Sequence, residues 1–118
     1  MLTVSSGLTF VNPKVYSVVR NQPYYSLAKV RKLAVSGKCI INTKARATAR
    51  AAFGWDQDDI KKAISKLQHK HFHKSDTRYD NPGIYVDYYK ANNLIGEKVY
   101  IHFRIEDNCL IICSFKEI

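Results

Sequence analysis

Hydrophobic residues in the first half of the chain recur every three or four positions, which is the spacing of a helix that buries one face. The first stripe lies between Ser26, a residue type that begins helices, and Gly37, a residue type that ends them. Similar patterns predict a second helix over residues 43–53, capped by its first residue and ended by Gly54, and a third that begins within residues 56–59. The stripes are Leu27, Val30, Leu33 and Ala34 in the first helix and Ile60, Ile64 and Leu67 in the third.

Beyond residue 70 the hydrophobic spacing changes to every second position, which is typical of β-strands. Strands are predicted over residues 72–79, 84–90, 98–105 and 110–115, and short turns rich in Asn, Asp and Gly join them. Short turns make neighbouring strands antiparallel. The sequence therefore predicts an α+β domain, with N-terminal helices packed on one face of an antiparallel β-sheet.

The predicted elements fall within residues 24–118, which we expect to form one domain. Residues 1–23 have no clear period and end in the loop signal Asn21-Gln22-Pro23, so we expect an N-terminal extension that is either a short ordered arm or a flexible tail. No apolar run reaches the roughly 20 residues of a membrane helix, and the start lacks the features of a signal peptide. These features predict a cytoplasmic protein without a membrane partner.

Three cysteines are present, at positions 39, 109 and 113. The odd number and the absence of a CxxC pair argue against a disulfide framework and against a zinc knuckle. We expect reduced thiols that pack as small hydrophobic groups.

Alternation in the last two predicted strands separates two sets of side chains. Over residues 98–105, Val99, Ile101, Phe103 and Ile105 alternate with Tyr100, His102 and Arg104. Over the last strand, Ile111, Cys113 and Phe115 alternate with Leu110, Ile112, Ser114 and Lys116. The apolar set of residues 98–105 should face the helices. The opposite, polar face combines cations for phosphates with rings for stacking bases, although the solvated face of a one-sided sheet has a similar composition.

The charge balance also favours an anionic partner, because 19 Lys and Arg residues oppose 10 Asp and Glu residues, for a net charge of +9. A surplus of this size on a small domain lies on the surface, where it attracts nucleic acid, anionic lipid or an acidic protein. A role in solubility alone is the alternative.

RNA can be cleaved without a metal or another cofactor. A base takes the proton of the 2′-hydroxyl, this oxygen attacks the phosphorus, a cation stabilises the charge, and an acid protonates the leaving oxygen. Tyr, Lys, His and Arg can fill these roles, and no Asp/Glu cluster resembles a magnesium site. His69, His71 and His73 alternate and could together hold zinc or nickel in an extended chain, but their lysine-rich surroundings favour a surface position.

Several short blocks of the sequence resemble, in the same order, those of a known protein family. Residues 72–79 read FHKSDTRY, and residues 99–117 begin with VYIH and end with LIICSFKE. They resemble the FYKS-x-T-x-Y stretch and the VYLK…VLIVSFKE strands of the MqsR family of toxins. Residues 27–37 resemble the family's first helix and residues 43–45 the start of its second, so the similarity runs from about Tyr24 to the C-terminus.

The resemblance implies a fold similar to that of the RelE ribonucleases. It also implies a sequence-selective, ribosome-independent mRNA endoribonuclease that cuts at short GCU-like triplets as the toxin of a type II toxin–antitoxin system. The partners would be mRNA and a cognate antitoxin, either MqsA-like or of another kind. The alternative is a non-catalytic module that binds nucleic acid or antitoxin on the same fold.

Catalytic residues of the family carry over to Lys74, Tyr100 and Lys116. The family glutamine aligns with Val86, a departure that affects RNA contact more than the chemistry, and for which Tyr85 or Tyr88 could substitute. The residues that we expect to bind RNA are His73, Arg78, Tyr85, His102 and Arg104.

Overall fold

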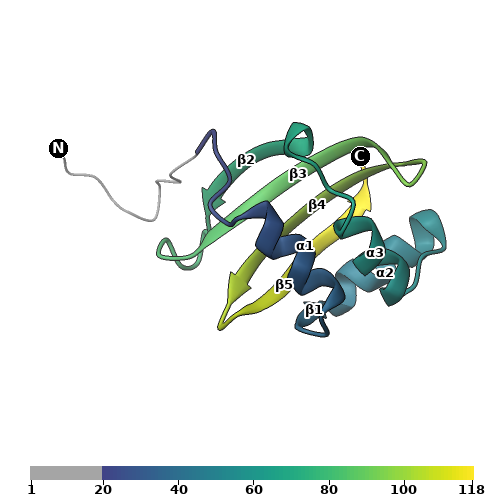
Figure 1. Cartoon of the computed structure of the whole chain (residues 1–118), viewed down its shortest axis with the longest axis horizontal. Helices are drawn as coiled ribbons and strands as arrows, with labels where there is room; N and C mark the ends of the chain where they lie inside the picture. Colours follow the sequence, from purple (N-terminus) through teal and green to yellow (C-terminus); the bar gives the residue numbers. More distant parts are fainter. Residues whose placement is uncertain (1–19) are drawn as a thin grey trace, which may run out of the picture.

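Three helices and a five-stranded sheet make up the part of the chain that the computed structural model describes, residues 20–118 (Figure 1). In chain order the elements are α1 (Leu27–Val35), β1 (Cys39–Ile41), α2 (Thr43–Phe53), α3 (Gln57–Ile64), the 3₁₀ turn η2 (His69–His71), β2 (Phe72–Thr77), β3 (Tyr85–Leu94), β4 (Glu97–Glu106) and β5 (Cys109–Glu117). The predicted α+β class is confirmed. Most of the predicted N-terminal extension, residues 1–19, lies outside the described residues.

Short polar side chains define where the helices begin. Ser26 accepts a hydrogen bond from the Lys29 amide at the start of α1, as expected. The second helix is capped by Asn42 and not by Thr43, because the Asn42 side chain accepts from the Ala45 amide at 2.8 Å. α3 begins with a reciprocal capping box between Asp56 and Asp59.

The strands lie in the order β1-β5-β4-β3-β2. The pairs β2–β3, β3–β4 and β4–β5 are antiparallel, as predicted, whereas β1 pairs with β5 in parallel. The sequence indicated only a brief extended piece at residues 39–41, and the structure makes this piece an edge strand. No helix in residues 20–118 has the length and apolar character needed to span a bilayer.

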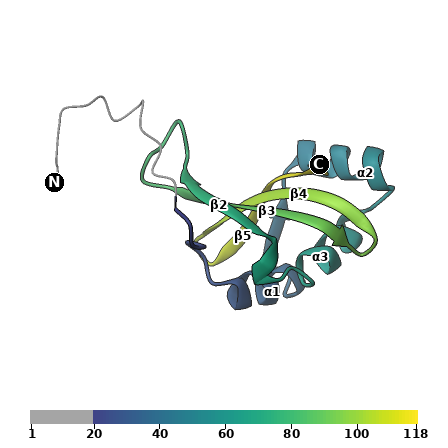
Figure 2. The same cartoon turned by 90° about the horizontal axis from the view of Figure 1, so that it is seen from above.

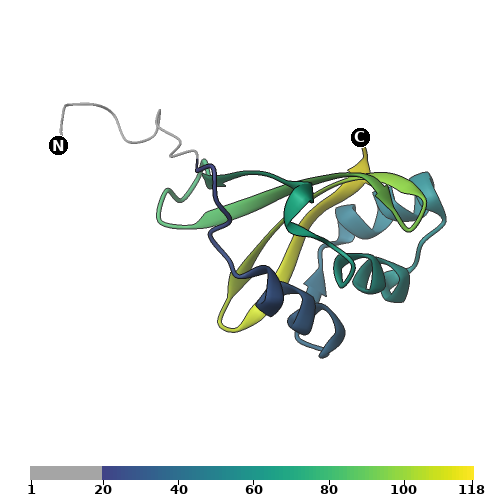
Figure 3. The same cartoon turned by 45° about the horizontal axis from the view of Figure 1, so that its top comes forward.

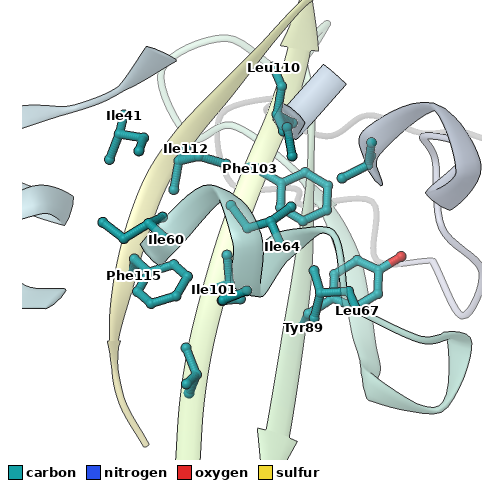
Figure 4. Close-up of a cluster of buried hydrophobic side chains, with 14 of the residues drawn as sticks. Ile41, Ile60, Ile64, Leu67, Tyr89, Ile101, Phe103, Leu110, Ile112 and Phe115 are labelled. Carbon is teal, nitrogen blue, oxygen red and sulfur yellow. The ribbon is translucent and has the colours of Figure 1, made fainter. Parts of the chain in front are cut away.

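A hydrophobic core lies between the sheet and the helices α1 and α3. Val99, Ile101 and Phe103 of β4 are fully buried, which confirms the predicted alternation. Figure 4 shows Ile60 and Ile64 of α3 packed over these strands. α1 and α3 cover this side of the sheet, and the polar set of β4 lies on the opposite side.

A β-bulge interrupts the alternation in β5. Phe103 pairs with Ile112 and His102 pairs with Ser114, so Cys113 is an extra residue in β5. As a result, Leu110, Ile112 and Phe115 are all buried. The predicted simple alternation, which grouped Phe115 with Cys113 and Ile111, is therefore wrong for this strand.

α2 lies along the edge of β5, beyond the end of β1, whereas α1 and α3 lie beneath the sheet (Figure 2). The Asn42 side-chain amide donates to the Cys113 carbonyl at 2.9 Å, and the Thr48 hydroxyl donates to the Phe115 carbonyl at 2.6 Å. The buried residues Ala45 and Ala49 allow this close approach. α2 therefore protects the β5 edge from pairing with another chain.

The segment before α1 crosses the opposite end of the sheet (Figure 3). The backbone of Arg20 pairs with that of Ser75 on the outer edge of β2, at 2.7 and 3.1 Å. The buried carboxylate of Asp87 then accepts the amides of Tyr24 and Tyr25, both at 3.0 Å. Asp87 therefore has a structural role in this segment.

Candidate active site on the open face of the sheet

The sheet face turned away from α1 and α3, here called the open face, brings together polar residues from four strands. Cross-strand pairing places them in two neighbouring rows. The first row is Lys74, Tyr88, His102 and Ser114, and the second row is Lys90, Tyr100 and Lys116. The three predicted catalytic residues therefore lie in adjoining rows, although they are far apart in the sequence.

Tyr100 lies at the centre of the second row, between two lysines. The Nζ atoms of Lys116 and Lys90 lie 5.5 and 5.8 Å from the centre of its ring. Burial raises the pKa of the Tyr100 phenol above its usual value. The hydroxyl therefore keeps its proton at neutral pH and can donate a hydrogen bond to an anion.

The first row contains an aromatic stack. The rings of Tyr88 and His102 lie 4.7 Å apart and 22° from parallel. The Nζ atom of Lys74 lies 4.8 Å from the centre of the Tyr88 ring and forms an ion pair with Asp76 at 3.7 Å. A cation, a phenol and an imidazole thus occur side by side on one surface.

His102 is electrostatically distinct from an ordinary surface histidine. Its half-buried ring and the positive charges of Lys116 and Lys74 lower its pKa to about 4. The imidazole is therefore neutral at pH 7 and has a nitrogen that can accept a proton.

Comparison with known proteins identifies the family of this chain. Residues 22–117 match the model of the family described as the motility quorum-sensing regulator, toxin of MqsA. The chain belongs to the MqsR toxin family. It is also 30% identical over 98 residues to the mRNA interferase toxin MqsR of Escherichia coli (strain K12), and the match covers 83% of this chain and 97% of that relative.

Val86, which we expect at the glutamine position of the family, is on the open face, where it pairs with Asp76 of β2. Val86 is a buried hydrophobic residue and offers no hydrogen bond to RNA from its side chain. Of the two tyrosines suggested as substitutes, Tyr88 lies on the same face as Val86, two residues along β3. The residue that we expect at the glutamine position of the family is therefore apolar and lies beside an aromatic stack.

Tyr85, predicted to bind RNA, lies on the other face of the sheet. Its ring stacks on that of Tyr24 at 4.2 Å, and the Arg20 guanidinium lies 5.6 Å from its centre. Its backbone carbonyl accepts the Tyr25 hydroxyl at 2.7 Å. The structure does not bring Tyr85 together with the other predicted site residues.

The predicted RNA-binding residues other than Tyr85 and His102 surround the two rows. His73 is exposed at a bulge in β2, and the partial desolvation of its ring and the charges of Lys90 and Lys74 lower its pKa. Arg78 forms two hydrogen bonds with Asp80, at 2.6 and 2.9 Å. Arg104 donates to Cys113 Sγ at 3.2 Å and pairs with Glu106 at 3.4 Å.

The sequence interpretation missed Lys90 and gave Tyr88 only a secondary role. Alternation along β3 places both with Val86, and that pattern was visible in the sequence. What the sequence did not show is which residue of β4 each one would face.

The alternating histidines do not share a face, because residues 69–71 form a 3₁₀ turn and not an extended strand. His71 faces inward, and its Nδ1 accepts the Gln68 amide at 3.0 Å. Within residues 20–118, no group of three or more His, Cys, Asp or Glu side chains is placed to hold a metal ion.

Proposed function

We propose that this chain is a ribosome-independent, metal-independent endoribonuclease that cleaves mRNA on its open face, as the toxin of a type II toxin–antitoxin system. The observation that carries the proposal is the position of Tyr100 between Lys116 and Lys90, beside the neutral His102. These groups can transfer protons and stabilise an anion without a metal. The E. coli relative is named an mRNA interferase toxin, which supports the same activity.

The open face suits a single-stranded RNA. The lysines of the two rows can bind successive phosphates, and the stacked rings of Tyr88 and His102 offer a platform for an unpaired base. His73 extends this basic surface at the β2 bulge. Arg78 and Arg104 are already paired with acidic groups, so they contribute their remaining donors to RNA.

In the proposed reaction, the 2′-oxygen attacks the adjacent phosphorus and the 5′-oxygen leaves. Lys74 and Lys116 stabilise the negative charge that develops on the phosphoryl oxygens, and the Tyr100 hydroxyl donates a hydrogen bond to them. The products are a 2′,3′-cyclic phosphate and a 5′-hydroxyl. Only RNA reacts, because the nucleophile is its own 2′-hydroxyl.

The test is cleavage of a long, mixed-sequence RNA by purified protein, with EDTA present and ribosomes absent. We expect fragments with cyclic-phosphate or 3′-phosphate ends and 5′-hydroxyl ends. Fragments with 5′-phosphates, or activity that EDTA abolishes and magnesium restores, would contradict the mechanism. Binding without fragments would support the non-catalytic module, for which Val86 at the glutamine position is the specific argument.

The proposed partner is an acidic, MqsA-like antitoxin, and the family description names MqsA. The exposed cations Lys44, Arg46 and Arg50 lie on α2, and the latter two line a hollow of about 680 Å³ between α2 and the start of α3. The β2 edge offers less room for an added strand, because Arg20 already pairs with Ser75. The basic α2 surface is thus favoured as a contact for acidic side chains.

A further inference from the structure

His102 is the open-face residue that four strands surround with functional groups. Tyr88 of β3 stacks on its ring, and Tyr100 of β4 lies 6.0 Å away between ring centres. Lys74 of β2 and Lys116 of β5 lie close enough for their charges to act on the imidazole. Ser114 of β5 is its direct cross-strand partner.

We propose that His102 is the general base of the cleavage reaction, which accepts the proton of the attacking 2′-hydroxyl between Lys74 and Lys116. This assignment rests on the proposed endoribonuclease function and names the residue that starts it. The stack on Tyr88 fixes the plane of the imidazole, and the two lysines place a bound phosphate next to it.

The neighbouring groups are less suited to this role. A protonated lysine has no lone pair to accept a proton, and the Tyr100 phenol keeps its own proton because burial raises its pKa. The Asp76 carboxylate is paired with Lys74. Among these groups, His102 combines a free lone pair with a central position.

Bound RNA strengthens His102 as a base. In the free protein, burial and the charges of Lys116 and Lys74 hold its pKa at about 4, which makes a weak base. A phosphate between the two lysines offsets their charge, so the pKa of the imidazole rises when RNA binds. The base therefore becomes effective when the substrate is in place.

The proton balance of the step is complete. His102 takes the proton from the 2′-hydroxyl, the bond from the 2′-oxygen to phosphorus forms, and the bond from phosphorus to the 5′-oxygen breaks. The ammonium group of Lys116 gives a proton to the leaving 5′-oxygen. Exchange with water then removes the proton from His102 and returns one to Lys116.

The experiment uses a short synthetic RNA that spans a cleavage site mapped with the wild-type protein. Single-turnover cleavage is measured for His102→Asn, and affinity is measured with the same RNA carrying a 2′-deoxy sugar at the cleaved nucleotide. We expect cleavage to fall by about 10²- to 10⁴-fold. Affinity should fall much less than cleavage, because the variant loses one ring of the stacked platform but keeps the lysines and Tyr88. His69→Asn, an exposed histidine in the 3₁₀ turn, is the matched control and should cleave normally.

A second substrate separates the base from the acid. When sulfur replaces the bridging 5′-oxygen, the leaving thiolate needs no proton. Lys116→Ala should then recover much of its rate, and His102→Asn should stay slow, because the 2′-hydroxyl must still lose its proton. If instead the sulfur substrate rescues His102→Asn, the residue is not the base.

Further outcomes also decide the assignment. Normal cleavage by His102→Asn, or a loss of affinity as large as the loss of cleavage, would overturn it. If His102→Asn does not fold, His102→Ala is tested in its place with imidazole added to the solution. We expect the added imidazole to restore cleavage. If His102→Ala folds and imidazole does not restore cleavage, His102 is not the general base. A wild-type protein that cleaves no RNA would instead overturn the proposed function itself.

Discussion

Lys116 lies directly across the β4–β5 ladder from Tyr100, and this pairing depends on the bulge at Cys113. Phe103 pairs with Ile112, so a regular strand would place Phe115 opposite Tyr100 and Lys116 opposite the buried Val99. The extra residue shifts the pairing after Cys113 by one position, so that the Phe115 side chain enters the core and the Lys116 side chain reaches the open face. The bulge therefore assembles the candidate site and completes the core at the same time.

Tyr100→Phe and Lys116→Ala should each lower the rate of RNA cleavage by about a hundredfold. The first removes a hydroxyl from the centre of the site, and the second removes a cation 5.5 Å from the same ring. Cleavage and growth arrest are compared at equal expression. Lys62→Ala on α3 is the control for loss of a positive charge. If Tyr100→Phe or Lys116→Ala cleaves RNA as fast as this control, the residue that it replaces is not catalytic.

Most of the fold could be predicted from the sequence because the hydrophobic residues recur at regular helical and strand spacings. The spacing of Leu27, Val30 and Leu33 predicted α1, and alternation around Ile101 predicted β4 with the correct buried face. The parallel pairing of β1 could not be predicted from the sequence, because a strand of three residues is too short to show an alternating pattern. Its partner strand also lies about 70 positions away in the sequence. Local pattern does not encode such long-range pairing.

The candidate site was predicted from the resemblance and only in part from pattern. Alternation alone placed Tyr100 and His102 on a polar face, but it did not predict the register that sets Tyr88 against His102. Tyr85 was expected to bind RNA as a substitute for the family glutamine, and the structure places it against Tyr24 because the segment before α1 folds over that end of the sheet.

The neutral state of His102 should make the protein less stable in acid. Its pKa is about 4 in the folded protein and about 6.5 when unfolded, so between these values the unfolded chain binds a proton that the folded chain does not. The free energy of unfolding should therefore fall as pH drops from about 6.5 to about 4, by on the order of 2 kcal/mol for this group, because solvent screening of the half-buried ring reduces the roughly 3 kcal/mol of the full shift.

Urea unfolding of the wild-type protein and of His102→Asn across this pH range measures the effect. The variant should lose less stability in acid, and the remainder should come from His71 and His73, whose pKa values are also lowered. An identical pH dependence for both proteins would show that the His102 imidazole is not held neutral.

The turn between β3 and β4 contains a strained residue. Ile95 has φ of 52°, followed by Gly96 at 82°, in a two-residue hairpin turn that favours Asn-Gly. Ile95→Asn should raise the free energy of unfolding by about 1 kcal/mol, because Asn tolerates the left-handed region and the Ile side chain is already 49% exposed. Ile95→Val keeps the β-branch and should give no gain, so equal stability of the two variants would contradict this explanation.

The exposed cations of α2 are placed to contact the proposed antitoxin. Reversing Arg46→Glu and Arg50→Glu together should weaken antitoxin binding and slow association most at low salt, because an acidic partner would meet like charge. RNA cleavage should remain, since neither residue belongs to the open-face rows. A reversal of Lys29→Glu and Lys32→Glu on α1 changes the net charge equally and is the matched control.

If both double variants bind more weakly to the same degree, the antitoxin responds to overall charge and not to α2. If neither changes affinity at low or high salt, the contact lies elsewhere, and the exposed edge of β1 around Ile40 becomes the surface to test.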